Sequence, residues 1–263
     1  MSENLKLLES ILEAEASCSN AGTINAANYP SKNMNNFFGY GNFNGKYWFV
    51  GQEENGDCEY IDSIRLKWNG IDEIMDICES NPNSEYLKPG ARLVRTWSRL
   101  IRILLSYVLY ENENKELNID NEIIREIQIS CFGRKSSQIC SLNRSPIPRP
   151  PRSARNIIEN CNINSNISER IDKIVKIIKN KNKFIEFVIF YGWKDSDLII
   201  EKFKSEKIEF NKDKKAEGKE FWWGTLNNSI IIICNHAAIS TNKYFEEIGK
   251  FTRQKFSEVN KNL

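Results

Sequence analysis

The sequence predicts an α/β fold: a three-layer α/β/α sandwich with a central, mostly parallel sheet. Short apolar runs typical of buried strands alternate with segments of helical periodicity, and most of these runs end at a glycine or a polar turn. No repeat or low-complexity linker interrupts the 263 residues. We therefore expect a single domain over 1–263, in which 1–45 forms an N-terminal helix and loop extension.

The first half of the chain contains the clearest helix. Apolar residues recur at helical spacing over 91–109, and Arg92, Arg95, Arg99 and Arg102 form a basic ridge beside them. This ridge is either a solvated face or a binding surface. The other elements expected here are helices over 4–15 and 61–77, a loop up to Gly45, and a strand over 47–50 ended by Gly51.

The second half continues the alternation of strands and helices. The run 184–191 is the strongest strand signal and ends at Gly192. Prolines forbid regular structure in the basic segment 134–155, which has no acidic residue. The other expected elements are strands over 127–132, 138–142, 221–226 and 229–234, and helices over 167–180, 194–204 and from about Asn242 onward.

The composition excludes several classes of protein. The chain is 40% hydrophobic and 27% charged, with a net charge of +2, so affinity for nucleic acid requires local clustering of charge. Seven cysteines without a Cys-x-x-Cys pair disfavour a disulfide framework or a zinc ribbon. We expect a cytoplasmic protein without a signal peptide or membrane span, and a monomer.

Three predicted strand ends carry polar side chains, and this edge of the sheet is where α/β folds bind ligands. Gly51–Gly56 follows the first strand and brings the adjacent carboxylates Glu53 and Glu54. Asn143 follows the strand over 138–142, and His236, the one histidine of the chain, follows the strand over 229–234. The sequence therefore predicts one pocket built from three distant segments.

This combination resembles the uracil-DNA glycosylase superfamily from about Lys46 to Phe251. Gly51-Gln52-Glu53-Glu54-Asn55 occupies the place of its first motif, and His236-Ala237-Ala238 that of its His-Pro-Ser motif. The runs 64–68, 95–102 and 241–249 resemble an uncharacterised bacterial branch of this superfamily. Prolines of both motifs are replaced here, by Glu54 and Ala237. The resemblance implies a uracil-DNA-glycosylase-like fold, and the cysteine spacing argues against an iron–sulfur cluster. We expect no metal or other cofactor.

The resemblance also implies roles for individual residues. Glu53 would hold the attacking water and stabilise positive charge on the sugar, and His236 would donate a hydrogen bond to the leaving pyrimidine. Asn143 would read the edge of a base flipped out of the helix, and Gln52 would offer a backbone N–H to it. Glu54 and Asn55 would shape the pocket at pyrimidine C5. Trp68 or Tyr60 would stack under the base.

Contacts to DNA complete the expected site. Ile239 is either a wedge for the gap left by the flipped nucleotide or a core contact of the capping loop. Phosphate contacts are expected from Arg144, Arg149, Arg152 and Arg155 and from the backbone N–H groups near Ser240 and Thr241 at a helix start.

The sequence thus predicts a monofunctional DNA glycosylase that removes uracil or a C5-modified pyrimidine, in DNA repair or in defence against modified foreign DNA. Two alternatives stay open: a DNA-binding or sensing module without catalysis, and a hydrolase of small nucleotides. A metal site on Cys234 and His236 lacks further ligands at a suitable spacing.

Overall fold

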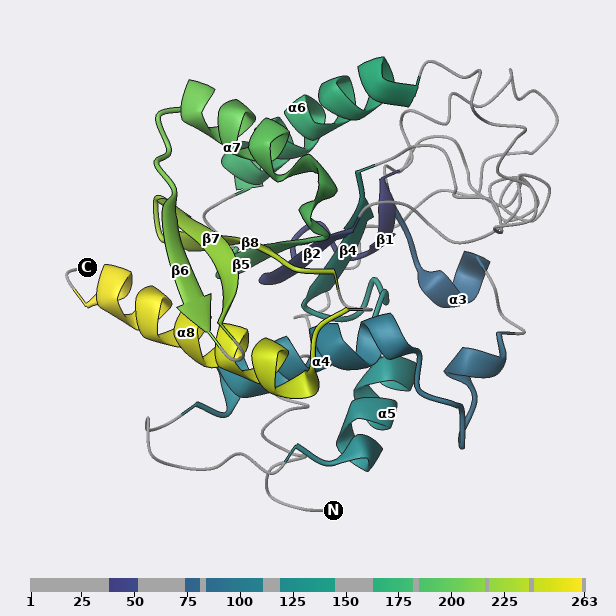
Figure 1. Cartoon of the computed structure of the whole chain (residues 1–263). Helices are drawn as coiled ribbons and strands as arrows, with labels where there is room; N and C mark the ends of the chain where they lie inside the picture. Colours follow the sequence, from purple (N-terminus) through teal and green to yellow (C-terminus); the bar gives the residue numbers. More distant parts are fainter. Residues whose placement is uncertain are drawn as a thin grey trace, which may run out of the picture.

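The computed structural model describes residues 38–51, 74–80, 84–110, 119–144, 163–181, 185–215, 218–236 and 239–261. Within them an eight-stranded sheet has the order β3-β1-β4-β2-β5-β8-β7-β6. Its strands are β1 (Gly39–Gly41), β2 (Tyr47–Gly51), β3 (Ile74–Met75), β4 (Ile139–Asn143), β5 (Phe187–Tyr191), β6 (Asn211–Lys215), β7 (Lys219–Leu226) and β8 (Ser229–Cys234). Figure 1 shows helices on both faces of the sheet.

The centre of the sheet is parallel. The strands β4, β2, β5 and β8 all run in one direction, so their carboxyl ends share one edge. Strands β7 and β6 extend the sheet antiparallel beyond β8, and β1 is antiparallel to β4. The prediction of an α/β fold with a mostly parallel sheet is confirmed at this level.

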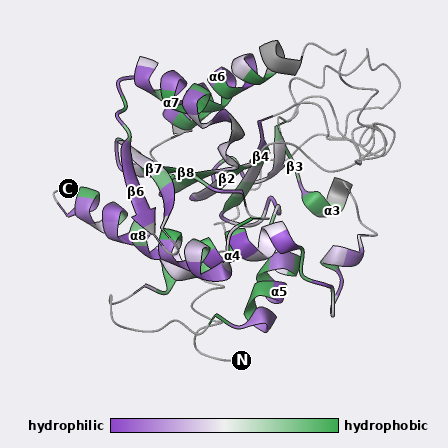
Figure 2. Cartoon of the chain, in the orientation of Figure 1, coloured by the Kyte–Doolittle hydropathy of each residue, from purple (hydrophilic) through white to green (hydrophobic). Residues whose placement is uncertain are grey.

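Helices cover the two faces in separate groups (Figure 1). On one face lie α4 (Arg95–Val108), α5 (Asn121–Ser130) and α8 (Asn242–Asn260); on the other lie α6 (Ile163–Lys181) and α7 (Ser196–Ser205). Shorter helical pieces are α3 (Ile77–Ser80), η2 (Glu85–Leu87) and η4 (Trp193–Asp195). Figure 2 shows hydrophobic residues in the central strands, whereas the edge strand β6 and much of the helices are hydrophilic.

The alternating side chains of the strands build two separate cores. Tyr47, Phe49 and Phe187 pack under α4 and α8, whereas Trp48 and Val188 pack under α6 and α7. Because parallel strands are covered on both faces, they are apolar throughout rather than alternating with polar residues. The buried Trp48 ring donates its N–H to the Gly45 carbonyl at 2.7 Å. Each large side chain buried in this way stabilises the fold by about 2 kcal/mol.

Two expected elements are wrong. The segment 127–132 forms the last turn of α5 and the turn after it instead of a strand. The alternation of isoleucines with polar residues suggested a strand, but Gln128 is buried and satisfied: its amide donates to the Tyr86 and Arg92 carbonyls and accepts from the Val94 N–H. The end of the helix expected over 61–77 is also wrong, because Ile74–Met75 is a strand.

Besides β3, two further strands were not predicted. β1 lies in the stretch expected to be a loop, and its Gly-Tyr-Gly sequence has no strand periodicity. Its glycines permit close pairing with β4, since a Cβ on Gly39 would lie 2.1 Å from the Ser141 carbonyl oxygen. The edge strand β6 is Asn-Lys-Asp-Lys-Lys, a composition that discourages pairing with another chain. The helix expected over 4–15 lies outside the described residues.

The helices α4 and α8 lie parallel and in close contact. Arg102 pairs with Glu246, and further along α8 Gln254 donates to the hydroxyl of Tyr110, just beyond the end of α4. Gly249 permits the close approach, because a Cβ there would lie 2.3 Å from the Ile103 carbonyl oxygen. Since α8 begins after β8, both helices begin at the edge where the parallel strands end.

We predict that Gly249→Ala lowers the free energy of unfolding by about 2 kcal/mol, because overpacking outweighs the roughly 1 kcal/mol that alanine gains in helix propensity. Chemical denaturation followed by circular dichroism measures this. Lys250→Ala, at the next position of α8, is the control and should change stability by less than about 0.5 kcal/mol. Equal stability of Gly249→Ala and wild type would contradict the close packing of α4 on α8.

Candidate functional site

The carboxyl ends of the central strands form a continuous row. Gly51 of β2 pairs with Asn143 of β4, and Tyr191 of β5 pairs with Cys234 of β8. From β2 the chain goes to β4 on one side and then returns to β5 on the other side, so the strand order reverses between β2 and β5. Ligands in doubly wound folds bind outside the carboxyl ends at such a reversal.

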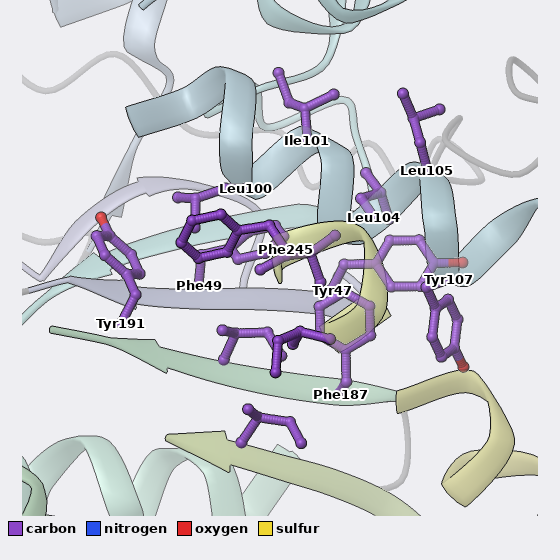
Figure 3. Close-up of a cluster of buried hydrophobic side chains, with 14 of the residues drawn as sticks. Tyr47, Phe49, Leu100, Ile101, Leu104, Leu105, Tyr107, Phe187, Tyr191 and Phe245 are labelled. Atoms are coloured by element: carbon purple, nitrogen blue, oxygen red, sulfur yellow. The ribbon is translucent and has the colours of Figure 1, made fainter. Parts of the chain in front are cut away.

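Tyr191 lies across the reversal point. A Cβ on Gly51 would lie 2.3 Å from the Tyr191 hydroxyl oxygen, so glycine alone leaves room for the tyrosine ring. The ring centroid of Tyr191 is 6.2 Å from that of His236. In Figure 3, Tyr191 stands at one end of the buried cluster that continues through Phe49. The ends of β2, β5 and β8 therefore meet around one aromatic side chain.

A buried guanidinium joins the same strand ends. Arg144 is 1% exposed, and its Nε donates to the Gly51 carbonyl at 3.1 Å. Its Nη2 donates to the carbonyls of Tyr191 and Gly192 at 3.3 and 3.1 Å, and its Nη1 is 3.5 Å from an Asp195 carboxylate oxygen. The guanidinium fork can satisfy several acceptors at once, which an ammonium cannot do from one position.

This geometry corrects the expectation that Arg144 contacts a DNA phosphate. The side chain is turned into the protein, where backbone carbonyls and Asp195 surround its charge. A buried charge is tolerated only when it is paired and hydrogen-bonded, and Arg144 is hydrogen-bonded through Nε and Nη2 and ion-paired through Nη1. Its role is to hold the edge of the sheet together.

Asn143 and His236 both lie at this edge and are half-buried. The backbone of Asn143 is fixed on both sides, since its N–H donates to the Phe38 carbonyl and its own carbonyl accepts from Arg170 Nε at 2.7 Å. Within the described part of the chain its side-chain amide makes no hydrogen bond, so the amide is available to a ligand. The His236 carbonyl accepts from the Ile239 N–H at 3.0 Å, which starts the turn into α8.

The three residues predicted to contact DNA in the loop before α8 differ in exposure and in their contacts. Ile239 is 69% exposed, an unusual exposure for a large aliphatic side chain. Thr241 caps α8, its hydroxyl accepting from the Tyr244 N–H at 3.3 Å. The Ser240 side chain is buried, and the phosphate contact of the backbone N–H groups at this helix start stays a prediction. The other predicted site residues lie outside the described residues: Gln52, Glu53, Glu54, Asn55, Tyr60, Trp68, Arg149, Arg152 and Arg155.

Sequence reasoning missed the segment that follows β5. Tyr191, Gly192 and Asp195 belong to the same edge as Asn143 and His236. The signal was present, because the strongest strand of the sequence ends at Gly192 as the first strand ends at Gly51. The partnership of Asp195 with Arg144 spans 51 positions and has no sequence pattern that would reveal it.

Two titratable groups near this edge, the Cys234 thiol and the Tyr244 hydroxyl, are held in their neutral forms. Burial raises the pKa of the Cys234 thiol to about 12, although the charge of Arg144 opposes the shift. Burial likewise raises the pKa of Tyr244, whose hydroxyl donates to the Glu220 carbonyl at 3.3 Å. Among the described residues, no group of three or more His, Cys, Asp or Glu side chains could hold a metal ion.

No protein-family model, curated protein or solved structure matched the chain. In the described part of the chain, no helix combines the length and the apolar character needed to cross a bilayer.

We predict that Arg144→Met lowers the free energy of unfolding by about 3 kcal/mol, because Asp195 and three carbonyl groups lose their buried partner. Arg144→Lys should recover only part of this loss, since one ammonium cannot replace the guanidinium fork. Urea denaturation measures both. Lys204→Met, which removes an exposed charge from α7, is the control; equal effects of Arg144→Met and Lys204→Met would refute the role given to Arg144.

We also predict that Cys234 resists alkylation by iodoacetamide in the folded protein at pH 8. With a pKa of about 12 the thiolate fraction is negligible, and burial blocks access to the sulfur atom. Peptide mass spectrometry before and after denaturation measures the labelling at each cysteine. Labelling of Cys234 in the native state at the rate of an exposed thiol would contradict this assignment.

Proposed function

We propose that the protein is a DNA glycosylase that hydrolyses the N-glycosidic bond of uracil or a C5-modified pyrimidine. The observation that carries the proposal is the meeting of three distant segments at one sheet edge: Gly51 beside Asn143, and His236 beside the tyrosine that covers Gly51. Gln52 and Glu53 follow Gly51 directly in the sequence. A carboxylate, a base-reading amide and an imidazole donor are the groups that this reaction needs.

The chemistry places opposite demands on the two sides of the nucleoside. As the bond breaks, positive charge develops on the sugar and negative charge on the departing base. In this proposal Glu53 orients the water and stabilises the sugar cation. His236 donates a hydrogen bond to the carbonyl oxygen of the base, and a donor aimed at developing negative charge contributes about 3 kcal/mol. Asn143 selects the base through its free amide group.

One feature of the loop before α8 supports a DNA substrate over a free nucleotide. Ile239 projects an apolar side chain into solvent three residues after His236, a suitable position for a wedge that fills the place of a flipped nucleotide. The buried Arg144 holds the strand ends in place without help from a ligand. Such a rigid edge can bind an extruded base without rearranging.

A base-release assay tests the proposal. Duplexes and single strands carrying uracil, thymine, hydroxymethylcytosine or glucosylated cytosine are incubated with the protein, and abasic sites are cleaved by alkali. We expect cleavage at one or more of these bases and none at unmodified cytosine. DNA binding without base release from any substrate would instead support the alternative of a binding module.

We predict that His236→Asn lowers the single-turnover rate of base release by about a hundredfold to a thousandfold. Glu53→Gln should abolish base release while DNA binding is kept, because it removes the carboxylate but preserves its size. Lys176→Gln, an exposed position on the opposite face, is the matched control and should retain the wild-type rate. If Glu53→Gln keeps full activity, Glu53 is not part of the mechanism.

A further inference from the structure

The arginines at the start of α4 differ from the other arginines of the described residues. Arg92, just before α4, and Arg95 and Arg99, in its first turns, are here called the α4 arginine cluster, and their side chains make no hydrogen bond or ion pair. Every other described arginine has a carboxylate, carbonyl, amide or aromatic partner: these are Arg102, Arg125, Arg134, Arg144, Arg170 and Arg253. Among the described residues, the arginine side chains without a partner are therefore all at the start of α4.

Arg99 is the member of the α4 arginine cluster in the least favourable surroundings. The side chain is half-buried, and its Nη1 is inaccessible to solvent and has no hydrogen-bond partner. Arg102 Nε is in the same situation, but the other nitrogens of Arg102 bind Glu246 and Asn121, whereas those of Arg99 bind nothing. Burial and the nearby charge of Arg95 both lower the pKa of Arg99. Two neighbouring positive charges and an unsatisfied N–H donor lower the stability of the fold. The described residues alone therefore give no reason for Arg95 and Arg99 to lie side by side on α4. An anion at this position would remove the cost.

The position of the cluster relates it to the candidate site. Arg102, one turn further along α4, pairs with Glu246 of α8 at 2.6 Å, and the two helices run parallel. Arg99 therefore lies level with the first turn of α8, and Arg95 lies one turn earlier. Both helices begin at the edge of the sheet that carries Asn143 and His236 (Figure 1).

We propose that the α4 arginine cluster binds the phosphodiester backbone of DNA beside the candidate base pocket. Guanidinium groups bind phosphate oxygens through paired hydrogen bonds, and several arginines along one face fit a chain of regularly spaced anions. Among the described residues, the cluster takes the place of Arg144, which is buried and paired inside the protein, as a source of positive charge at this edge. The inference rests on the proposed function for the identity of the polyanion.

The test is the salt dependence of DNA binding. A short fluorescein-labelled duplex without modified bases is titrated with wild type and with the double variant Arg95→Gln/Arg99→Gln at several salt concentrations. We expect the double variant to bind about tenfold to a hundredfold more weakly than wild type. The slope of log K against log salt, which is negative, should become less steep by about two. An unchanged slope overturns the inference.

A matched control and a stability measurement separate binding from folding. Lys176→Gln/Lys204→Gln removes two exposed charges from α6 and α7, on the opposite face, and should leave the slope unchanged. Arg99→Gln should melt at or above the wild-type temperature, because it removes a repulsive and unsatisfied group. A lower melting temperature would show that Arg99 supports the fold instead, and would overturn the inference.

The base-release assay distinguishes failure of this inference from failure of the proposed function. Base release combined with an unchanged salt slope would retain the glycosylase and reject the cluster as its DNA contact. A reduced slope without base release from any substrate would retain the cluster as a DNA-binding surface and reject the glycosylase. Absence of binding to the duplex at low salt would overturn both, and would leave an acidic protein as the ligand class to test on the cluster.

Discussion

The arrangement of the candidate site depends on the guanidinium of Arg144, buried where the strand order reverses. Parallel strands end in carbonyl groups that have no further strand partner, and these groups must find donors when the edge is covered. Arg144 supplies donors to the ends of β2 and β5, while Asp195 balances its charge. One side chain thereby fixes the relative positions of segments that lie far apart in the chain. The residues of the candidate site next to these segments are positioned by the same contacts.

The packing of the core beneath this edge also positions residues of the candidate site. Gly51 has no side chain, which lets the Tyr191 ring lie over the end of β2 and approach His236. The ring belongs to the buried cluster that includes Phe49 and Phe245 (Figure 3), so its position is set by the core and not by solvent. A site bordered by core residues needs little ordering when a ligand binds, and this lowers the cost of recognition.

The arginines near this edge fall into two groups. Arg144 and Arg102 form ion pairs within the protein, with Asp195 and Glu246, and contribute to the fold. Arg95 and Arg99 have no such partner, although the sequence shows four similar basic residues, three on one predicted helix and Arg144 just after a predicted strand. The difference lies in which carboxylates the fold brings near each arginine, and sequence spacing within one helix carries no information about that.

The sequence by itself determined the alternation of elements and the edge at which polar residues gather. Apolar runs and helical periodicity are local properties, so β2, β5, β8, α4 and α8 were predictable, as was the placement of Asn143 and His236 at strand ends. Tertiary structure alone decided that β1 joins the sheet, that Arg144 turns inward, and that Tyr191 completes the site. These outcomes depend on long-range contacts: the glycines of β1 against β4, and Asp195 against Arg144. Such pairings depend on how the chain crosses the sheet, which no local pattern encodes.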